Sequence, residues 1–167
     1  MLKPVKVRII QPSNNKVTLA GAFGCVRWVW NQSLATMSQT YKETGKGISA
    51  LTMKKQIPVW KTEHEWLKEC YSQCLQSSVL NLSQAFINFF DGRAAYPTFK
   101  KRQGRQSMQY PQNVKILSHS EIKFPGNLGV VIGTRAVGQE RRTLFEQVSV
   151  DAFQSLLVPL GDGGAGT

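Results

Sequence analysis

A run of basic residues interleaved with aromatic rings is the part of the sequence that most clearly suggests chemistry. Between Gly92 and Tyr110 there are five basic residues and no acidic one. Cations of this kind bind backbone phosphates, and aromatic rings give bases a surface for stacking. A solvated charge run would carry the same cations, but the rings and two prolines favour a structured loop. The residues concerned are Lys100, Lys101, Arg102 and Arg105, with Tyr96, Phe99 and Tyr110 between and beside them.

A second group of polar residues has the spacing of one helical face. It comprises Ser72, Gln73, Gln76 and Ser77, which are uncharged where surface helices usually carry Lys and Glu. Amides and hydroxyls both donate and accept hydrogen bonds, so such a face could read base edges in a groove. An ordinary solvated face has the same pattern, and spacing alone favours that simpler interpretation.

The nucleophilic and metal-binding side chains are few. Cys70 and Cys74 are one helical turn apart, where metal ligands can sit, but Cys25, His64 and His119 complete no known ligand pattern. We therefore expect buried, reduced thiols on a helix, with no metal, disulfide or cofactor. No Ser/His/Asp or Cys/His arrangement stands out, so the sequence does not predict an enzyme.

The overall charge indicates a polyanionic partner. The chain has 167 residues, a net charge of +11 and a pI of about 9.9, and neutralising phosphates releases their counterions. The net charge is +8 over residues 1–60, −2 over 61–91 and +5 over 92–167, which suggests a basic groove around a helical centre. The sequence has neither a run of about 20 apolar residues nor a signal-peptide pattern, so we expect a cytoplasmic protein without membrane contact, which could associate with the nucleoid.

Three helices are expected to position these side chains. Apolar residues recur every three or four positions from about Asn15 to Tyr41, and glycines follow at 45 and 47. A shorter helix is predicted over residues 49–56, ending before Pro58. The third helix is predicted over residues 65–90, with Gly92 ending it.

Strands are expected on both sides of these helices. Residues 2–10 alternate apolar and basic side chains, which predicts a strand. From Val114 onward the apolar runs are short and separated by Gly, Pro and Asn, which predicts short strands at 114–117, 121–124, 128–132, 143–150 and 153–158. The pattern predicts an α+β fold, in which a small barrel or sheet is interrupted after its first strand by a helical insertion.

Three blocks of the sequence resemble a known family. They are FGCVRWVWNQSL (residues 23–34), WLKECYSQCLQSSVLNLSQAFINFFDG (66–92) and YPTFKKRQGRQSMQYPQN (96–113). In this order and spacing they resemble the start of TnpB, also called OrfB, the RNA-guided nuclease that bacterial insertion sequences encode. The resemblance extends from Met1 to about Leu128.

The resemblance implies a fold and a domain organisation. The family has a wedge-type β-barrel interrupted after its first strand by a three-helix recognition insertion, a region described in such families as helix-turn-helix. Here the first barrel strand would lie in residues 1–12 and the insertion in 13–92. The basic loop and remaining strands would occupy 93–145, and 146–167 would be a divergent, flexible tail.

The resemblance also implies partners and binding residues. Family members bind a guide RNA from the transposon end and read a short motif beside the DNA target. The motif-reading positions would fall on Ala50, Lys54, Ser72, Gln73, Gln76, Pro111 and Gln112. The resemblance implies that Lys100, Lys101, Arg102 and Arg105 hold guide or target phosphates. Arg27 and Asn31 would either brace the recognition lobe or contact RNA.

Departures from the family pattern limit the expected activity. After Leu128 the sequence diverges, and Asp151 and Asp162 lie in no recognisable catalytic motif. Two-metal cleavage requires several converging carboxylates, so we expect a nucleic-acid-binding fragment, truncated before the RuvC-like domain, that does not cleave. Two alternatives stay open: a regulatory fragment acting on a full-length homologue or its guide RNA, and an inert relic.

Overall fold

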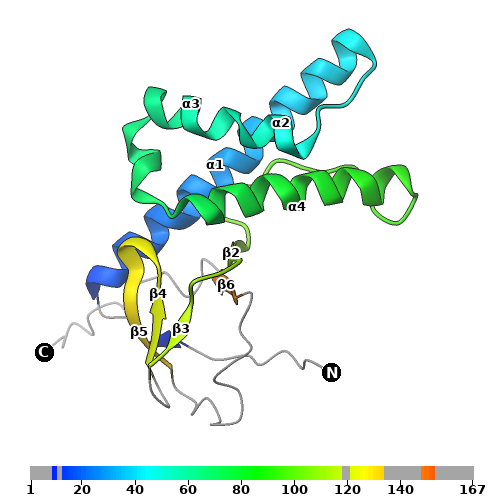
Figure 1. Ribbon diagram of the computed structural model, residues 1–167. Helices are drawn as coiled ribbons and strands as arrows, with labels where there is room; N and C mark the ends of the chain where they lie inside the picture. The colour runs from blue at the N-terminus through cyan, green and yellow to red at the C-terminus, as the bar shows by residue number, and fades with distance from the viewer. Residues whose placement is uncertain (1–8, 11–12, 118–120, 134–147, 153–167) are drawn as a thin grey trace, which may run out of the picture.

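The computed structural model describes residues 9–10, 13–117, 121–133 and 148–152 (Figure 1). Helices form one layer of the molecule, and the strands lie against the part of that layer nearest the start of α1 (Figure 1). None of the helices in the described part of the chain is long and apolar enough to span a membrane.

The longest element is α1, which covers Ser13–Thr44. Its predicted apolar stripe is confirmed, because side chains spaced three or four residues apart face the core. Gly45 follows with a φ of 69°, a left-handed conformation that glycine adopts without steric penalty. Tyr41 departs from the pattern, since half of its side chain is exposed at the end of the helix. The buried stripe consists of Leu19, Phe23, Val26, Trp30, Leu34 and Met37.

Two short helices follow α1, where the sequence predicts one that ends before Pro58. Helix α2 covers Ala50–Lys54 and α3 covers Gln56–Glu63, so Pro58 lies inside a helix and the predicted end is wrong. Pro58 is the third residue of α3, where the backbone N–H has no partner within the helix and its loss costs little. Ile57 and Trp60 on either side of it are buried, which anchors the helix by packing.

The third predicted helix begins later than the sequence suggests. Residues Glu65–Glu69 form a short 3₁₀ helix, η1, and α4 covers Ser72–Phe90. Cys70 between them is extended, with a φ of −90° and a ψ of 141°, so it precedes the helix that carries Cys74. Burial of Leu67 below α1 fixes this irregular turn. The predicted end at Gly92 is confirmed, with a φ of 73°.

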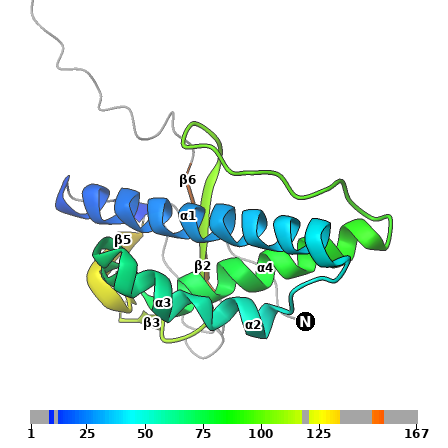
Figure 2. The same ribbon diagram turned by 90° about the horizontal axis from the view of Figure 1, so that it is seen from above.

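Helices α1 and α4 pack side by side and run in the same direction, and α2 and α3 connect the end of α1 back to the start of α4 (Figure 2). Near the start of α4 and the middle of α1, the Ser78 hydroxyl donates a 3.1 Å hydrogen bond to the Val26 carbonyl. Near their ends, the rings of Tyr41 and Phe90 are 6.4 Å apart. The two contacts therefore pair the second half of α1, from Val26 to Tyr41, with α4 from Ser78 to Phe90.

The strands form two antiparallel sheets. The first has the order β1 (Ile9–Ile10), β5 (Gly129–Gly133), β4 (Glu121–Phe124) and β3 (Lys115–Ile116). The second pairs β2 (Gln106–Tyr110) with β6 (Val148–Ala152). The first sheet matches three of the predicted strands. Strand β2 lies where the sequence predicts a continuous loop. Strand β6 overlaps the end of the strand predicted at 143–150, within the segment that is also predicted as a flexible tail. Most of the predicted strand at 2–10, and those at 143–150 and 153–158, fall largely outside the described residues.

The helices and strands share one apolar core. Met108 and Tyr110 of β2, with Phe124 and Leu128 beside β5, are buried in the same cluster as the stripes of α1 and α4. On the helix side this cluster includes Leu75, Val79 and Leu82 of α4. Phe90, the last residue of α4, is 64% exposed. The shared core fixes β2, and therefore the chain entering it, against both long helices.

Candidate nucleic-acid interface

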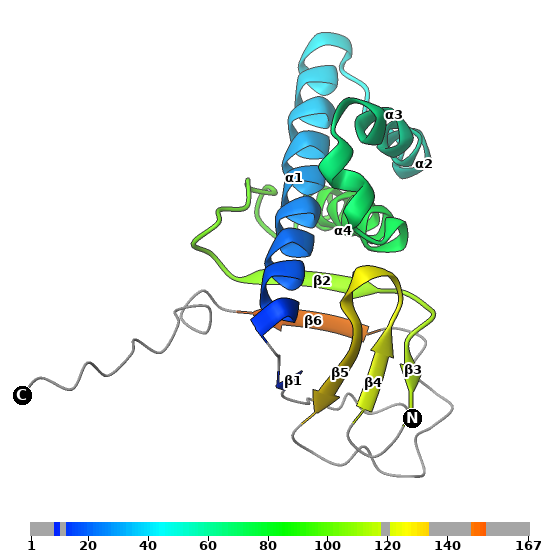
Figure 3. The ribbon, with the colours of Figure 1, turned by 90° about the vertical axis from the view of Figure 1, so that its left-hand side faces the viewer.

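The segment that links α4 to β2 follows α1 over much of its length. We call residues 93–105 the basic loop. It leaves the far end of α4 and returns along the side of α1 that faces away from α4, before β2 crosses beneath both helices (Figures 2 and 3). Helix α1 therefore lies between α4 and the basic loop, and its outer face is the surface that positions the loop.

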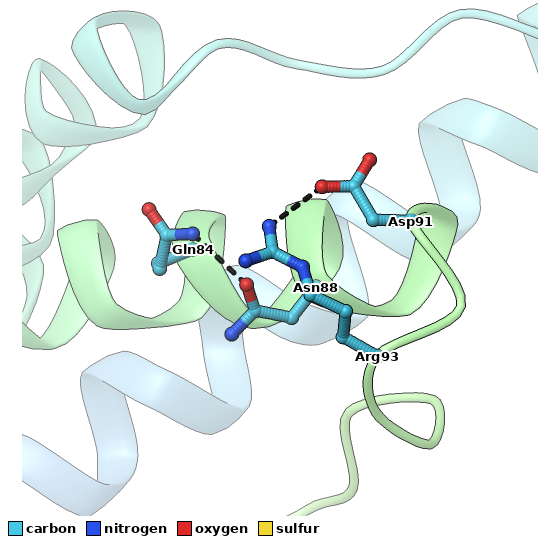
Figure 4. A network of polar contacts seen from close by, with 4 residues as sticks. All are labelled: Gln84, Asn88, Asp91 and Arg93. Atoms are coloured by element: carbon cyan, nitrogen blue, oxygen red, sulfur yellow. Dashed lines mark hydrogen bonds and ion pairs between the residues drawn. The ribbon is translucent and has the colours of Figure 1, made fainter.

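A small polar network fixes the start of the basic loop (Figure 4). Arg93 forms a 2.6 Å ion pair with Asp91, and its backbone N–H donates a 2.8 Å hydrogen bond to the Asn88 carbonyl. The Gln84 amide donates to Asn88 Oδ1 at 3.0 Å. The last turn of α4 thus directs the chain away from the helix before the cationic part of the loop begins.

Two side chains of α1 hold the middle of the loop by its backbone. Asn31 donates from Nδ2 to the Lys100 carbonyl at 3.0 Å and accepts from the Lys100 N–H at 2.8 Å. One residue earlier on the helix, Trp30 donates from Nε1 to the Thr98 carbonyl at 3.0 Å. Because these bonds engage the main chain, they set the loop's path and leave its cationic side chains available.

A third contact from α1 holds the turn at the end of the loop. Arg27 donates to Gln106 Oε1 at 2.9 Å, and Gln106 itself is only 6% exposed. The Gln106 Nε2 lies within 3.0 to 3.2 Å of the carbonyls of Lys101, Arg102 and Gly104. Arg27 and Asn31 therefore both brace the loop in this structure.

The cations of the loop differ in their surroundings. Lys101, Arg102 and Arg105 are exposed, whereas Lys100 is half-buried, with its Nζ 4.2 Å from the centre of the Trp30 ring. Burial lowers the pKa of the Lys100 ammonium below its ordinary value. The loop thus presents a row of solvated charges beside one that is partly desolvated.

A pocket of about 210 Å³ opens where the basic loop meets β2 and the two long helices. Its wall includes the amides of Asn81 and Gln109, which lie 3.3 Å apart in a hydrogen bond. Lys100 and Arg105 bring two cationic side chains to the same pocket. Ser107 of β2 also lines it. The pocket therefore combines positive charge with groups that donate and accept hydrogen bonds.

The predicted motif-reading residues gather at a different place, around the start of α4. Ser72, Gln73 and Gln76 are half-buried there, and the Lys61 ammonium of α3 donates a hydrogen bond to the Ser72 hydroxyl. Ser77 is 6% exposed, so the prediction that it shares their solvated face is wrong. Its position one residue beyond Gln76 rotates its side chain towards the core.

The remaining members of that predicted group belong to α2 and to the chain after β2. Ala50 begins α2 and Lys54 ends it, both half-buried, and α2 packs on α4. Gln112 is exposed and Pro111 half-buried. The next residue, Asn113, donates a 2.8 Å hydrogen bond to the hydroxyl of Tyr71, which directly precedes Ser72. This bond brings the chain after β2 to the beginning of α4.

Two residues that hold the interface are absent from the predicted set. Trp30 is predicted only as part of the apolar stripe, yet its indole N–H also binds the loop. Gln106 sits among basic residues and has no distinguishing pattern in the sequence. A signal for Trp30 is its position next to Asn31 and one turn after Arg27, because residues three and four apart share a helix face.

The three cysteines are buried, as predicted, but Cys70 is extended and precedes α4, so its predicted position on a helix is wrong. A hydrogen bond with Cys70 and burial raise the pKa of Cys25. A hydrogen bond with Cys25 lowers the pKa of Cys70, but hydrogen bonding with Cys74 and burial outweigh it and raise that pKa to about 12. Among the described residues, no three His, Cys, Asp or Glu side chains form a group that could hold a metal ion.

Comparison with known proteins places these features in a family. The model of a helix-turn-helix domain of OrfB proteins (HTH_OrfB_IS605) matches residues 1–46. The chain is 39% identical over 108 residues to an Escherichia coli K12 protein described as "Putative RNA-guided DNA endonuclease InsQ". It is 31% identical over 111 residues to a protein of Streptomyces pristinaespiralis described as "Putative RNA-guided DNA endonuclease". The matches cover 64% and 65% of this chain but 27% and 28% of those relatives.

A further relative is a short protein. The chain is 32% identical over 116 residues to the Salmonella dublin "Virulence protein VsdF", and the match covers 63% of this chain and 98% of that relative. Together, the helix-turn-helix match and the basic, loop-bearing fold define a transposon-associated protein of the nucleic-acid-binding class. The chain belongs to the TnpB-like, or OrfB, family, and it corresponds to that family's amino-terminal region.

Within the range that the helix-turn-helix model matches, residues 13–44 form a single continuous helix. Its outer face is occupied by the contacts of Trp30 and Asn31 with the basic loop and of Arg27 with Gln106 at the start of β2. In this structure α1 therefore acts as the support of a cationic loop, and the exposed charges belong to the segment it holds.

Proposed function

We propose that this chain binds guide RNA from a transposon end together with target DNA, and that it does not cleave by itself. The observation that carries the proposal is the clamped basic loop. Helix α1 holds the loop by its backbone at Lys100, while Lys101 and Arg102 stay exposed. A cationic loop fixed in one shape loses less conformational entropy when a phosphate backbone binds.

The residues around the start of α4 would read the motif beside the target. Lys54, Ser72, Gln73 and Gln76 supply donors and acceptors on adjoining elements, and Gln112 follows β2 nearby. This division of roles would let the basic loop supply affinity and the α4 start supply sequence preference, as phosphate and base contacts do elsewhere.

We further propose that the strands belong to a wedge-type barrel interrupted by the recognition helices. The support is the order of elements: β1 precedes all the helices in sequence yet pairs with β5, which follows them. In the proposed division, residues 1–12 hold the first strand and 13–92 form the helical insertion. Residues 93–145 hold the basic loop and further strands, and 146–167 form the divergent tail. Hydrogen exchange that protects β1 and β5 together would support this arrangement.

The binding proposal is tested with two sets of charge reversals. Lys100, Lys101 and Arg102 are changed together to Glu; the control changes Lys42, Lys46 and Lys55, which are exposed elsewhere, to Glu. Both variants lose the same net charge. Titration is carried out with transposon-end RNA and with an unrelated RNA of equal length, at two salt concentrations.

The loop variant should lose affinity for both RNAs, and its salt slope should fall by about 2, or roughly 0.7 for each lost contact to a single strand. The control should lose much less. Equal losses in the two variants would show that only net charge matters and would refute the assignment to the loop. Incubation with guide, target and Mg²⁺ should leave the target intact; cleavage that co-purifies with the chain would contradict the non-cleaving part of the proposal.

The short relative supports a second candidate function. Because VsdF is almost fully covered by the match, a protein of this region's extent exists without a long further segment. We propose as the alternative that such a chain regulates a full-length homologue or competes for its guide RNA. Co-purification with an intact homologue, or inhibition of its cleavage that excess guide RNA relieves, would favour this function.

A further inference from the structure

The pocket between α1, α4 and β2 contains an unusual cation. Lys100 Nζ lies over the Trp30 ring at 4.2 Å, half-buried, at the edge of a space of about 210 Å³. Among the described residues, no carboxylate forms an ion pair with it. Removing an ammonium from water without a counter-ion is unfavourable, so this side chain is held in a position that an anion would stabilise.

Contacts to the backbone hold Lys100 in that position. Asn31 fixes both the N–H and the carbonyl of Lys100, and Trp30 supplies the ring beneath the ammonium as well as the bond to Thr98. The same two α1 residues thus determine where the charge sits. Arg105 adds a second cationic side chain to the pocket wall.

The opposite part of the pocket suits a nucleotide. Asn81 and Gln109 place two side-chain amides together, and Ser107 adds a hydroxyl. Amides and hydroxyls pair with base edges and sugar hydroxyls. At roughly 30 Å³ per water molecule, the pocket has the volume of about seven waters, which is room for a phosphate and part of its sugar but not for a duplex.

We propose that this pocket receives one nucleotide of a single-stranded nucleic acid, with its phosphate between Lys100 and Arg105 and its sugar or base edge against Asn81 and Gln109. The proposal rests on the proposed nucleic-acid-binding function and adds a specific subsite to it. None of the motif-reading residues of α4, Ser72, Gln73 and Gln76, lines this pocket, although Cys74 and Ser78 of the same helix do.

The subsite predicts a conflict between stability and binding at one residue. Lys100 is half-buried and has no ion-pair partner among the described residues, so Lys100→Met should raise the Tm while keeping the aliphatic stem over Trp30. The same variant should bind single strands at least about tenfold more weakly, because a hydrogen-bonded charge is lost. Lys101→Met is the matched control: its side chain is exposed, so the loss should stay below about fivefold and the Tm should not rise.

Binding is measured by fluorescence anisotropy with an oligouridine, an oligothymidine and a duplex of equal length. A larger loss for Lys100→Met than for Lys101→Met on the single strands, with equal losses on the duplex, supports the subsite. If Lys100→Met loses more affinity for the oligouridine than for the oligothymidine, the nucleotide comes from RNA; the reverse result assigns it to DNA. Equal losses for the two variants on every probe would overturn the subsite and leave the loop's general role intact. If neither variant changes binding to any probe, the proposed function of the loop fails as well.

A second variant tests the pocket without removing charge. Ser107→Leu places an apolar side chain in the pocket from β2, where a larger residue suits a strand. It should weaken single-strand binding as Lys100→Met does, while the duplex affinity and the salt slope for the duplex stay unchanged. Unaltered single-strand affinity in a folded Ser107→Leu protein would show that no nucleotide enters the pocket.

Discussion

The clamp that Asn31 makes on the basic loop yields a quantitative prediction. Asn31→Ala removes both hydrogen bonds to the Lys100 backbone, of 3.0 and 2.8 Å. A net hydrogen bond contributes about 0.5–1.5 kcal/mol. The freed groups of Lys100 are half-buried, so water recovers part of this, and we expect the loop to be destabilised by about 1–2 kcal/mol.

Limited trypsin digestion measures this local effect, because the loop contains the bonds after Lys100, Lys101 and Arg102. When opening is fast compared with cleavage, the cleavage rate follows the population of the open loop. A change of 1–2 kcal/mol corresponds to roughly a 5- to 30-fold faster cleavage. Cleavage after Lys61, which is half-buried in α3, should change much less, because the core is intact.

Two further variants sharpen the measurement. Gln32→Ala changes an exposed neighbour on the same helix and should leave cleavage unchanged. Asn31→Asp keeps the acceptor for the Lys100 N–H but loses the donor to its carbonyl, and should fall between the wild type and Asn31→Ala. If Asn31→Ala is cleaved within twofold of Gln32→Ala, the clamp does not hold the loop and our account of α1 is wrong.

Three other predictions concern the core, the thiols and the buried cation. Leu75→Ala in α4, where the side chain is fully buried, should lower the free energy of unfolding by about 2–5 kcal/mol in urea; Leu80→Ala, 46% exposed on the same helix, should change it by less than about 0.5 kcal/mol. Cys25 and Cys70 should resist iodoacetamide at pH 8 in the folded protein and react in urea, because their raised pKa values and burial keep them protonated and covered; fast labelling of the native protein would contradict this. The pKa of Lys100 is lowered in the folded state, so the unfolded state keeps the proton to a higher pH. The stability of the wild type relative to Lys100→Met should therefore rise with pH between the lowered and the ordinary lysine pKa. Thermal unfolding of both proteins across this pH range measures the effect.

Much of the helical layer could be predicted from spacing alone. The stripe of α1 repeats every three or four residues over many turns, and Gly45 and Gly92 mark the ends of α1 and α4. Such signals are local, because a helix is formed by neighbours in the chain. The errors at Pro58 and Glu65 also have local causes, since a proline in a first turn and a 3₁₀ turn resemble other patterns.

The basic loop could be predicted by its composition but not by its shape. Its cations and aromatics are adjacent in sequence, whereas β2 at its end becomes a strand by pairing with β6, far along the chain. Gln106, which no sequence pattern singles out, is buried and donates to three carbonyls of the loop. Strand formation depends on such distant partners, and propensity alone says little about them.

The charge, the helical stripes, the buried thiols and the family follow from the amino-acid sequence, because each of these depends on residue types or on near neighbours. The roles of Arg27 and Asn31 depend on the folded chain, since their partners lie 79 and 69 residues away. The folded chain also distinguishes Lys100 from Lys101, because burial over Trp30 is a property of packing. Contacts between segments so far apart form only when the core that joins α1, α4 and β2 closes, and no local pattern specifies them.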